Sequence, residues 1–235
     1  MRSVCVLLSA LIIVIGVSVS AQATLIDNGG GFIYDTDLGI TWLQDANYAQ
    51  TSGYDADGRM NWSAANAWAA SLTLGGLTGW RLPTTVDSSP VVFGYDGTLT
   101  YNFGYNITTS EMGHLYYTEL GNKGYYATDG TNPQTGWGLT NTAPFINLQP
   151  YYYWSGTESA ANPGSAWNFL FYDGAQYVND ESDDEFDAWA VHSGNVGPAA
   201  VPEPGTALLL GSGLVGLVGI GLRRARRRRG RPAAG

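Results

Sequence analysis

The sequence predicts an α+β fold: one domain with two helices in its first half and short, mostly antiparallel strands. Apolar residues recur at helical spacing in two stretches, 60–72 and 108–122. From residue 151 onward, short aromatic runs alternate with clusters of Gly, Asn and Asp, as strands alternate with turns. The domain is expected to span residues 24–200, a length that suits a substantial core.

The first 23 residues predict a secretory signal peptide. Arg2 precedes an apolar run over 4–19, and Ala21 and Ala23 supply the small residues of a cleavage site, expected after Ala23. The only cysteine, Cys5, lies in this segment. The exported domain therefore has no thiol for a disulfide, a metal site or a nucleophile.

The domain opens with two predicted strands in 31–43, joined by an Asp/Gly turn. The first helix, over 60–72, ends at Gly75-Gly76 and has one apolar stripe, formed by Ala65, Trp68, Ala69 and Leu72. The second helix, over 108–122, has Ser110 as its N-cap and Gly121 at its end, with a buried face of Met112, Leu115, Tyr116 and Leu120. A loop-rich segment then runs to Pro150, and strands follow near 151–157, 166–172 and 186–192.

The domain is strongly acidic. Residues 24–201 hold nineteen of the twenty acidic side chains but only three of the eleven basic ones, which gives a formal charge of −16. Such a surface repels nucleic acid and sulfated polysaccharides and attracts cations. We therefore expect no nucleic-acid partner.

The C-terminus combines three features in order. Val201 and the triplet Pro202-Glu203-Pro204 precede 18 uncharged residues, 205–222, which as a helix would span ~27 Å, close to the thickness of a bilayer's hydrocarbon core. Seven arginines follow, of which Arg223, Arg224, Arg226, Arg227, Arg228 and Arg229 form the main basic cluster. The positive-inside rule keeps such a cluster in the cytoplasm, whereas a disordered basic tail would be the alternative.

This region, 201–235, resembles the PEP-CTERM sorting signal, with its Pro-Glu-Pro motif, transmembrane helix and basic tail (223–231). The resemblance implies a bacterial envelope protein that inserts transiently into the membrane through the helix 205–222. An exosortase and the export machinery would be its partners. It also implies delivery to the cell surface, or to the exopolysaccharide matrix of a biofilm.

The body resembles a second family, the Lcl C-terminal domain, long catalogued as a domain of unknown function in bacterial surface proteins. The resemblance is carried by the runs "GWRLPT" (79–84), "YYWSGTE" (152–158), "AWNFLFYDG" (166–174) and "AWAVHSG" (188–194). Its signature positions here are Trp42, Trp80, Arg81, Leu82, Pro83, Trp154 and Ser155. We expect them to build the fold, with Trp80 and Leu82 buried and Arg81 paired with an acid.

The same resemblance implies a C-type-lectin-like fold related to formylglycine-generating enzymes. Those enzymes use active-site cysteines, so their activity is excluded for this domain. Sugar-binding C-type lectins carry carboxylates where Asn162-Pro163 and Trp167-Asn168-Phe169 stand here, so the resemblance does not extend to calcium-bridged sugar binding.

Two groups of side chains could hold a metal ion. Glu111, His114 and Glu119 share the second helix and could bind a transition metal, or could be a capping Glu beside a packed His. The segment 179–187 has six acids in nine residues, and Asp180, Asp183, Asp184 and Asp187 could hold calcium, the one cofactor considered. A solvated, self-repelling loop is the alternative there. The shorter run 55–58 is expected to be a turn.

Aromatic residues of the loop-rich segment are candidates for contact with neutral polysaccharide. Trp137, Tyr125 and Tyr126 lie between residues 121 and 144, among Gly, Asn and Thr. Loops carry binding residues more often than strands do, although aromatic side chains in loops also fold back onto the core.

These features predict an exported surface or matrix protein whose domain is a non-enzymatic binding or structural module. The only histidines, His114 and His192, accompany no nucleophile-elbow serine, and no catalytic carboxylate pair stands out among nineteen acids. A carboxylate-dependent envelope hydrolase and a calcium-dependent adhesion module are the alternatives.

Overall fold

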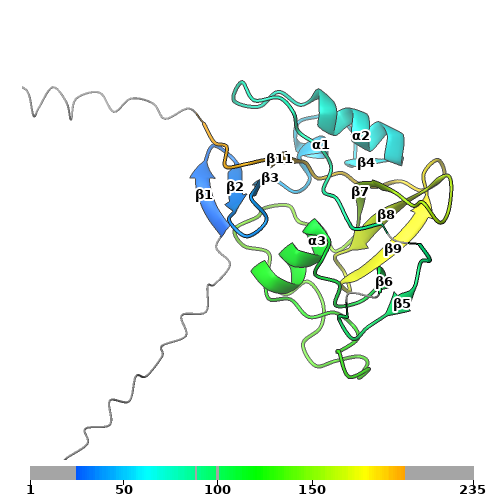
Figure 1. Ribbon diagram of the computed structural model, residues 1–235. Helices are drawn as coiled ribbons and strands as arrows, with labels where there is room; N and C mark the ends of the chain where they lie inside the picture. Colours follow the sequence, from blue (N-terminus) through cyan, green and yellow to red (C-terminus); the bar gives the residue numbers. More distant parts are fainter. Residues whose placement is uncertain (1–24, 88, 99–100, 199–235) are drawn as a thin grey trace, which may run out of the picture. The chain divides into compact units, whose positions relative to one another are not determined.

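The structure, a computed structural model, describes residues 25–87, 89–98 and 101–198. This part of the chain forms two β-sheets with a few short helices, and most of the strand pairs are antiparallel. The predicted α+β class is therefore confirmed (Figure 1). The C-type-lectin-like topology stays a prediction.

The first sheet contains β1 (Leu25–Gly29), β2 (Phe32–Asp35), β3 (Ile40–Leu43) and β11 (Val191–Ser193), in that order. All of its pairs are antiparallel. The predicted strands in 31–43 are β2 and β3, and Gly39 has the positive φ of 65° that the turn between them requires. β1 was not predicted, because it carries mostly exposed residues and no apolar alternation.

The second sheet has seven strands, in the order β4-β10-β7-β8-β9-β6-β5. Its long members are β7 (Tyr152–Glu158), β8 (Ser165–Leu170) and β9 (Ala175–Asp180). The short members are β4 (Arg59–Met60), β5 (Phe93–Gly94), β6 (Phe103–Gly104) and β10 (Phe186–Asp187). Only β10–β7 and β5–β6 pair in parallel among the described strands.

The predicted strand over 186–192 is wrong in one respect. The segment enters the second sheet as β10, passes through the buried residues Ala188, Trp189 and Ala190, and joins the first sheet as β11. A continuous apolar run is compatible with one buried strand or with a buried crossover, and the sequence pattern does not separate the two.

Both predicted helices are present. The first is α2 (Trp62–Ser71), capped by the side chain of Asn61. The second begins as α3 (Glu111–His114), with Ser110 as the cap, and continues as a π-helical turn, η1 (Leu115–Glu119). A short third helix, α1 (Tyr48–Thr51), was not predicted.

A cluster of aromatic side chains joins the two sheets. Trp42 of β3 lies 4.8 Å from Trp189 in the crossover, measured between ring centroids, and Trp189 lies 5.9 Å from Tyr153 of β7. Phe145, from the long loop segment, packs edge-on against Trp189 at 4.9 Å. This part of the chain has no cysteine and therefore no disulfide. Burial and packing of these large rings hold the two sheets together.

Three predicted features lie outside the described residues: the signal peptide 1–23, the helix 205–222 and the arginine cluster. Among the helices that the structure does describe, none has the length and apolar character needed to span a bilayer.

Candidate functional site

The signature residues of the body build the interior. Trp80, Leu82 and Pro83 are buried, and so are Trp42, Trp154 and Ser155. The indole N–H of Trp154 donates to the carbonyl of Met60 at 2.8 Å, which ties β7 to β4. The carbonyl of Ser155 accepts the indole N–H of Trp62 at 2.7 Å, which docks α2 on the same strand. Their role in this structure is to hold the elements together.

Arg81 is paired with an acid, Glu111. Its guanidinium donates two parallel hydrogen bonds to the carboxylate, at 2.8 and 2.7 Å, and the backbone N–H of Thr84 donates to the same group. Bidentate Arg–carboxylate pairs fix orientation strongly. This pair fastens the start of α3 to the segment after α2, and it removes Glu111 from the predicted metal group.

The four aspartates considered for calcium do not form one site. Asp180 lies in an exposed turn, where its Oδ1 accepts hydrogen bonds from the backbone N–H groups of Ser182 and Asp183, so the pKa of Asp180 is lowered. Asp184 accepts from Asn179. Asp187, by contrast, lies in the interior as part of β10. Both residues of β10 are buried, so Asp187 is enclosed along with Phe186, which the run of acids in the sequence conceals.

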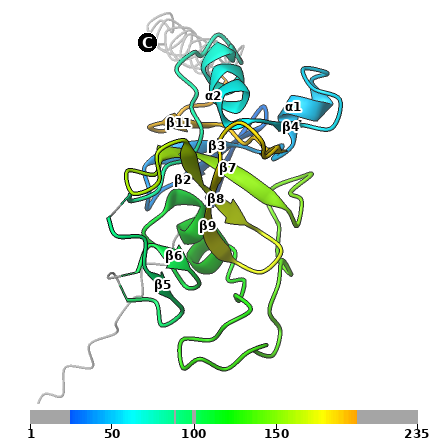
Figure 2. The same ribbon diagram turned by 90° about the vertical axis from the view of Figure 1, so that its right-hand side faces the viewer.

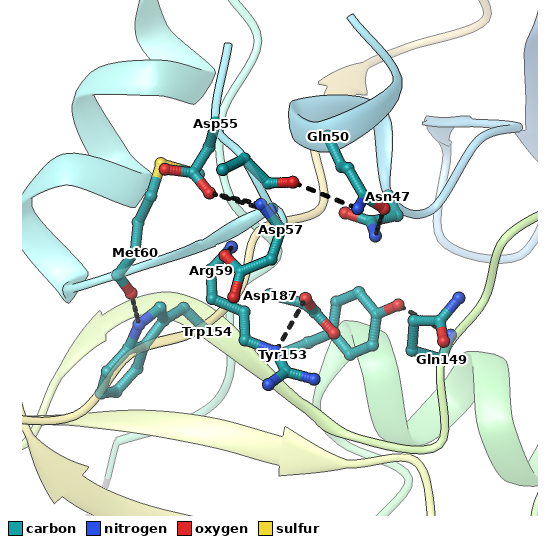
Figure 3. Close-up of polar contacts among 12 residues, drawn as sticks. Asn47, Gln50, Asp55, Asp57, Arg59, Met60, Gln149, Tyr153, Trp154 and Asp187 are labelled. Carbon is teal, nitrogen blue, oxygen red and sulfur yellow. Dashed lines mark hydrogen bonds and ion pairs between the residues drawn. The ribbon is translucent and has the colours of Figure 1, made fainter. Parts of the chain in front are cut away.

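The buried side chain of Asp187 pairs with Arg59, which is 40 % exposed, on the neighbouring strand β4 (Figure 3). Its Oδ1 lies 3.8 Å from Nε of Arg59, whereas its Oδ2 is buried without a hydrogen-bond partner in the described part of the chain. The guanidinium of Arg59 also lies 4.0 Å from the ring centre of Tyr151. Burial raises the pKa of Asp187 to about 7, against the opposing effect of Arg59. The carboxyl is enclosed, so its role is structural.

The structure brings together a group of potential metal ligands that differs from the predicted one. Asp35, His114 and Glu119 each contribute one donor atom, and these atoms lie within 4.8 Å of one another. No other group of three such residues meets this distance within the described ranges. Asp35 comes from β2, far from the helix in sequence. It opens the run "DTDLGITW" (35–42), which resembles the first strand of the Lcl C-terminal domain, but nothing in the sequence pattern links it to the helix.

The three aromatic residues considered for polysaccharide contact lie in one continuous row. The row, which we call the aromatic row, runs from Tyr172 through Trp137, Tyr125 and Tyr126 to Tyr95. Successive ring centroids are 5.3, 5.0, 5.5 and 5.7 Å apart. The three inner rings are half-buried, whereas the two end rings, Tyr172 and Tyr95, are exposed.

Sequence reasoning missed the two ends of the row. Tyr172 lies in the turn between β8 and β9 and is 54 % exposed, and Tyr95 directly follows β5. The run "FYDG" carried a usable signal for Tyr172, because a turn at Asp173-Gly174 ends the strand and leaves the preceding side chain at its tip. Tyr95 lacked such a signal, since its position depends on how the loop segment folds against β5.

Side-chain amides hold the loop segment that carries the row. Gln134 donates to the carbonyls of Gly124 and Tyr126 at 2.6 and 3.0 Å. Asn106, which has a positive φ of 58°, donates to the carbonyls of Tyr95 and Tyr126 at 2.6 and 2.9 Å. These bonds replace the strand ladder that the loop lacks, so they fix the backbone that carries the rings.

Asp173 connects the row to the second sheet. Its backbone carbonyl accepts the N–H of Tyr125 at 2.8 Å, and its side chain accepts the hydroxyl of Tyr105 at 3.0 Å. Burial raises the pKa of the Asp173 carboxyl and, with the nearby Asp173, that of the Tyr105 hydroxyl. Figure 2 shows the loop segment, in green, at the same end of the domain as β5 and β6.

Comparison with known protein families gives two matches. Residues 200–229 match the PEP-CTERM protein-sorting motif, which supports an exported, membrane-anchored precursor processed by an exosortase. Residues 31–192 match the Lcl C-terminal domain, a range that contains the second sheet, the helices, the aromatic row and the first sheet except for β1 and the last residue of β11. Neither a curated protein nor a solved structure matches the chain. Over most of its length, this chain belongs to the family of the Lcl C-terminal domain.

Proposed function

We propose that the domain is a non-enzymatic binding module of the bacterial cell surface or exopolysaccharide matrix, which contacts neutral polysaccharide through the aromatic row. The observation that carries the proposal is the row itself: three half-buried rings on a loop held by Gln134 and Asn106, with an exposed ring from a neighbouring turn at each end. Exposed apolar groups that gather in one place mark binding surfaces.

The chemistry of the row suits sugars. Tyrosine and tryptophan present large, rigid faces with a polar edge, and little side-chain entropy is lost when they make contact. The C–H faces of a sugar ring can stack on such faces, while amides and hydroxyls of the loop accept and donate hydrogen bonds. Because the domain carries a formal charge of −16, neutral chains are favoured over sulfated ones.

The exosortase-type tail supports the location. The PEP-CTERM match implies that the domain leaves the cytoplasm while the C-terminus is still anchored. A module for polysaccharide would then be delivered to the compartment in which its ligand is secreted.

A glycan array with the exported protein tests the proposal. We expect binding to neutral polysaccharides, and Tyr172→Ala should weaken it by about 1 kcal/mol, roughly fivefold in Kd, because one exposed ring contact is lost. Trp137→Ala should weaken binding more, since it also removes the support of Tyr172. Tyr54→Ala is the matched control, because Tyr54 is equally exposed but follows α1, outside the row.

Two outcomes would contradict the proposal. Equal loss of binding with Tyr54→Ala and Tyr172→Ala would show that the row is not the contact surface. Absence of binding together with turnover of a glycoside or ester would favour the carboxylate-dependent hydrolase instead.

A further inference from the structure

A cluster of four ionisable side chains lies where the turn after β2 meets the helix α3–η1. Asp35 ends β2, Asp37 lies in the following turn, and His114 and Glu119 come from the helical segment. Nε2 of His114 is 3.3 Å from Oε1 of Glu119 and 3.9 Å from Oδ2 of Asp37. The cluster is separate from the aromatic row and does not depend on the function proposed above.

The π-helical turn creates this arrangement. Its hydrogen bond runs from the N–H of Leu120 to the carbonyl of Leu115, five residues back instead of four. The wider turn brings residues five apart onto one face, and His114 and Glu119 are five apart. In a regular α-helix, His114 would share its face with Glu111, as the sequence suggested. π-helical turns of this kind are frequent at functional sites.

Asp35, at the inner end of the cluster, has no ion pair with any residue that the structure describes. Asp35 is fully buried, and its Oδ2 has no hydrogen-bond partner in the described part of the chain. Its Oδ1 accepts the N–H groups of Asp37 and Leu38, which fixes the orientation of the carboxylate. The side chain of Glu119 is 1 % exposed. Buried carboxylates are normally paired or bound to a metal, and the guanidinium of Arg81 is already held by Glu111.

The electrostatics of Glu119 agree with this geometry. Its pKa is raised, first by burial and then by the carboxylate of Asp35, although the contact with His114 acts in the opposite direction. Three carboxylates around one imidazole leave excess negative charge at a site closed on its inner side. The outer side is open at Asp37, whose side chain is 44 % exposed.

We propose that Asp35, His114 and Glu119, with Asp37 as the outer ligand, bind a divalent transition metal ion, with zinc as the best fit. An imidazole nitrogen suits zinc and its neighbours, whereas calcium and magnesium prefer oxygen ligands alone. With bonds of ~2.0–2.2 Å, tetrahedral zinc holds its ligand atoms roughly 3.3–3.5 Å apart. The separation of 3.3 Å between His114 and Glu119 fits that value. The three donor atoms as a group lie within 4.8 Å of one another, and Asp37 is 3.9 Å from His114, so Asp35 and Asp37 would move inward when the ion binds.

The metal would have a structural role. It would join the first sheet, through β2 and its turn, to α3 and η1. The exported domain has no cysteine, so a metal would supply the cross-link that disulfides give other secreted domains.

The test uses the exported protein, stripped with a chelator and titrated with zinc chloride. We expect one zinc ion per chain by calorimetry and metal analysis, together with a rise in Tm. Cobalt(II) should substitute and give the visible absorption bands of a tetrahedral site. Calcium at a large excess should not displace either ion. His192→Gln is the matched control, because it removes the other histidine and leaves the cluster intact.

The decisive variant is Glu119→Gln. It should raise the Tm of the metal-free protein, because one uncompensated buried charge is removed, and it should weaken zinc binding at least tenfold. If Glu119 served only as a hydrogen-bond partner of His114, its replacement would not both raise the metal-free Tm and weaken zinc binding. Asp37→Asn, in an exposed turn, should weaken zinc binding severalfold without changing the metal-free Tm. The proposal would be overturned if Glu119→Gln bound zinc as tightly as the wild type and showed the same rise in Tm on zinc addition.

Discussion

At the scale of single residues, the fate of each acid depends on which way its strand or turn points it. Asp180 and Asp187 belong to the same acidic run, yet one lies in an exposed turn and the other is enclosed beside Arg59. Backbone hydrogen bonds lower the pKa of Asp180, whereas burial raises the pKa of Asp187 to about 7. A run of like charges therefore contains both a solvated turn and a buried carboxyl group that pairs with Arg59.

Asp187 makes the stability of the domain depend on pH. Because its folded pKa of about 7 lies above the usual value of 3.8, the folded state binds the proton more tightly than the unfolded state. The free energy of unfolding should therefore fall as the pH rises from about 4 to 7, by up to about 4 kcal/mol from this group. Asp187→Asn should remove this part of the decrease, measured by urea unfolding at several pH values.

Asp180→Asn is the control for that experiment. Asp180 is exposed and has its pKa lowered, so its replacement should leave the decrease between pH 4 and 7 in place. A slope in Asp187→Asn that matches the wild type would show that the buried carboxyl does not titrate in this range.

At the scale of elements, α3 and η1 are held by contacts with segments distant in the chain. The start of α3 is fixed by Arg81 and Glu111, and the π-helical turn at its end aligns His114 with Glu119. The same turn buries Tyr116, whose ring packs against Phe169 of β8. Close approach of the preceding loop to α3 is possible because residue 113 is a glycine.

Gly113→Ala should destabilise the domain. A Cβ at this position would collide with the backbone carbonyl of Ile107 and come within 2.7 Å of the hydroxyl of Ser110, the N-cap of α3. Because a backbone atom cannot move aside cheaply, we expect a loss of about 1–3 kcal/mol, visible as a lower Tm. Thr118→Ala, at an exposed position of η1, should change Tm little, and an equal shift in both variants would contradict the steric explanation.

At the scale of the whole molecule, the exported domain and the sorting tail are separate parts with separate tasks. The domain buries its aromatic residues between two sheets, whereas the tail matches a motif defined by a short triplet, an apolar stretch and arginines. The family matches likewise treat 31–192 and 200–229 as distinct.

We expect the mature protein to lack both ends. Signal peptidase should remove residues 1–23, and exosortase processing near Pro202-Glu203-Pro204 should remove 205–235. Intact-mass measurement on protein from the native host checks this, and a mature species that retains the arginine cluster would contradict it. Replacing the arginines with neutral residues should weaken retention of the precursor in the membrane.

The sequence alone determined the class of fold, both main helices, the long strands β7 and β8 and the sorting signal. Local patterns are sufficient for these features, because helical spacing, alternation, caps and a terminal motif are each written within about twenty residues. The same holds for the buried faces: Met112, Leu115, Tyr116 and Leu120 are all buried as their spacing predicts.

Only the tertiary structure decided which residues meet. It joined Asp35 to a helix about eighty positions away, paired Glu111 with Arg81 and turned Asp187 inward. It also added Tyr172 and Tyr95 to the three aromatic residues of the loop. The reason is physical: such contacts depend on the order of strands in the sheets, on one widened helical turn and on loop geometry. None of these has a local signature, because each results from packing between segments distant in the chain.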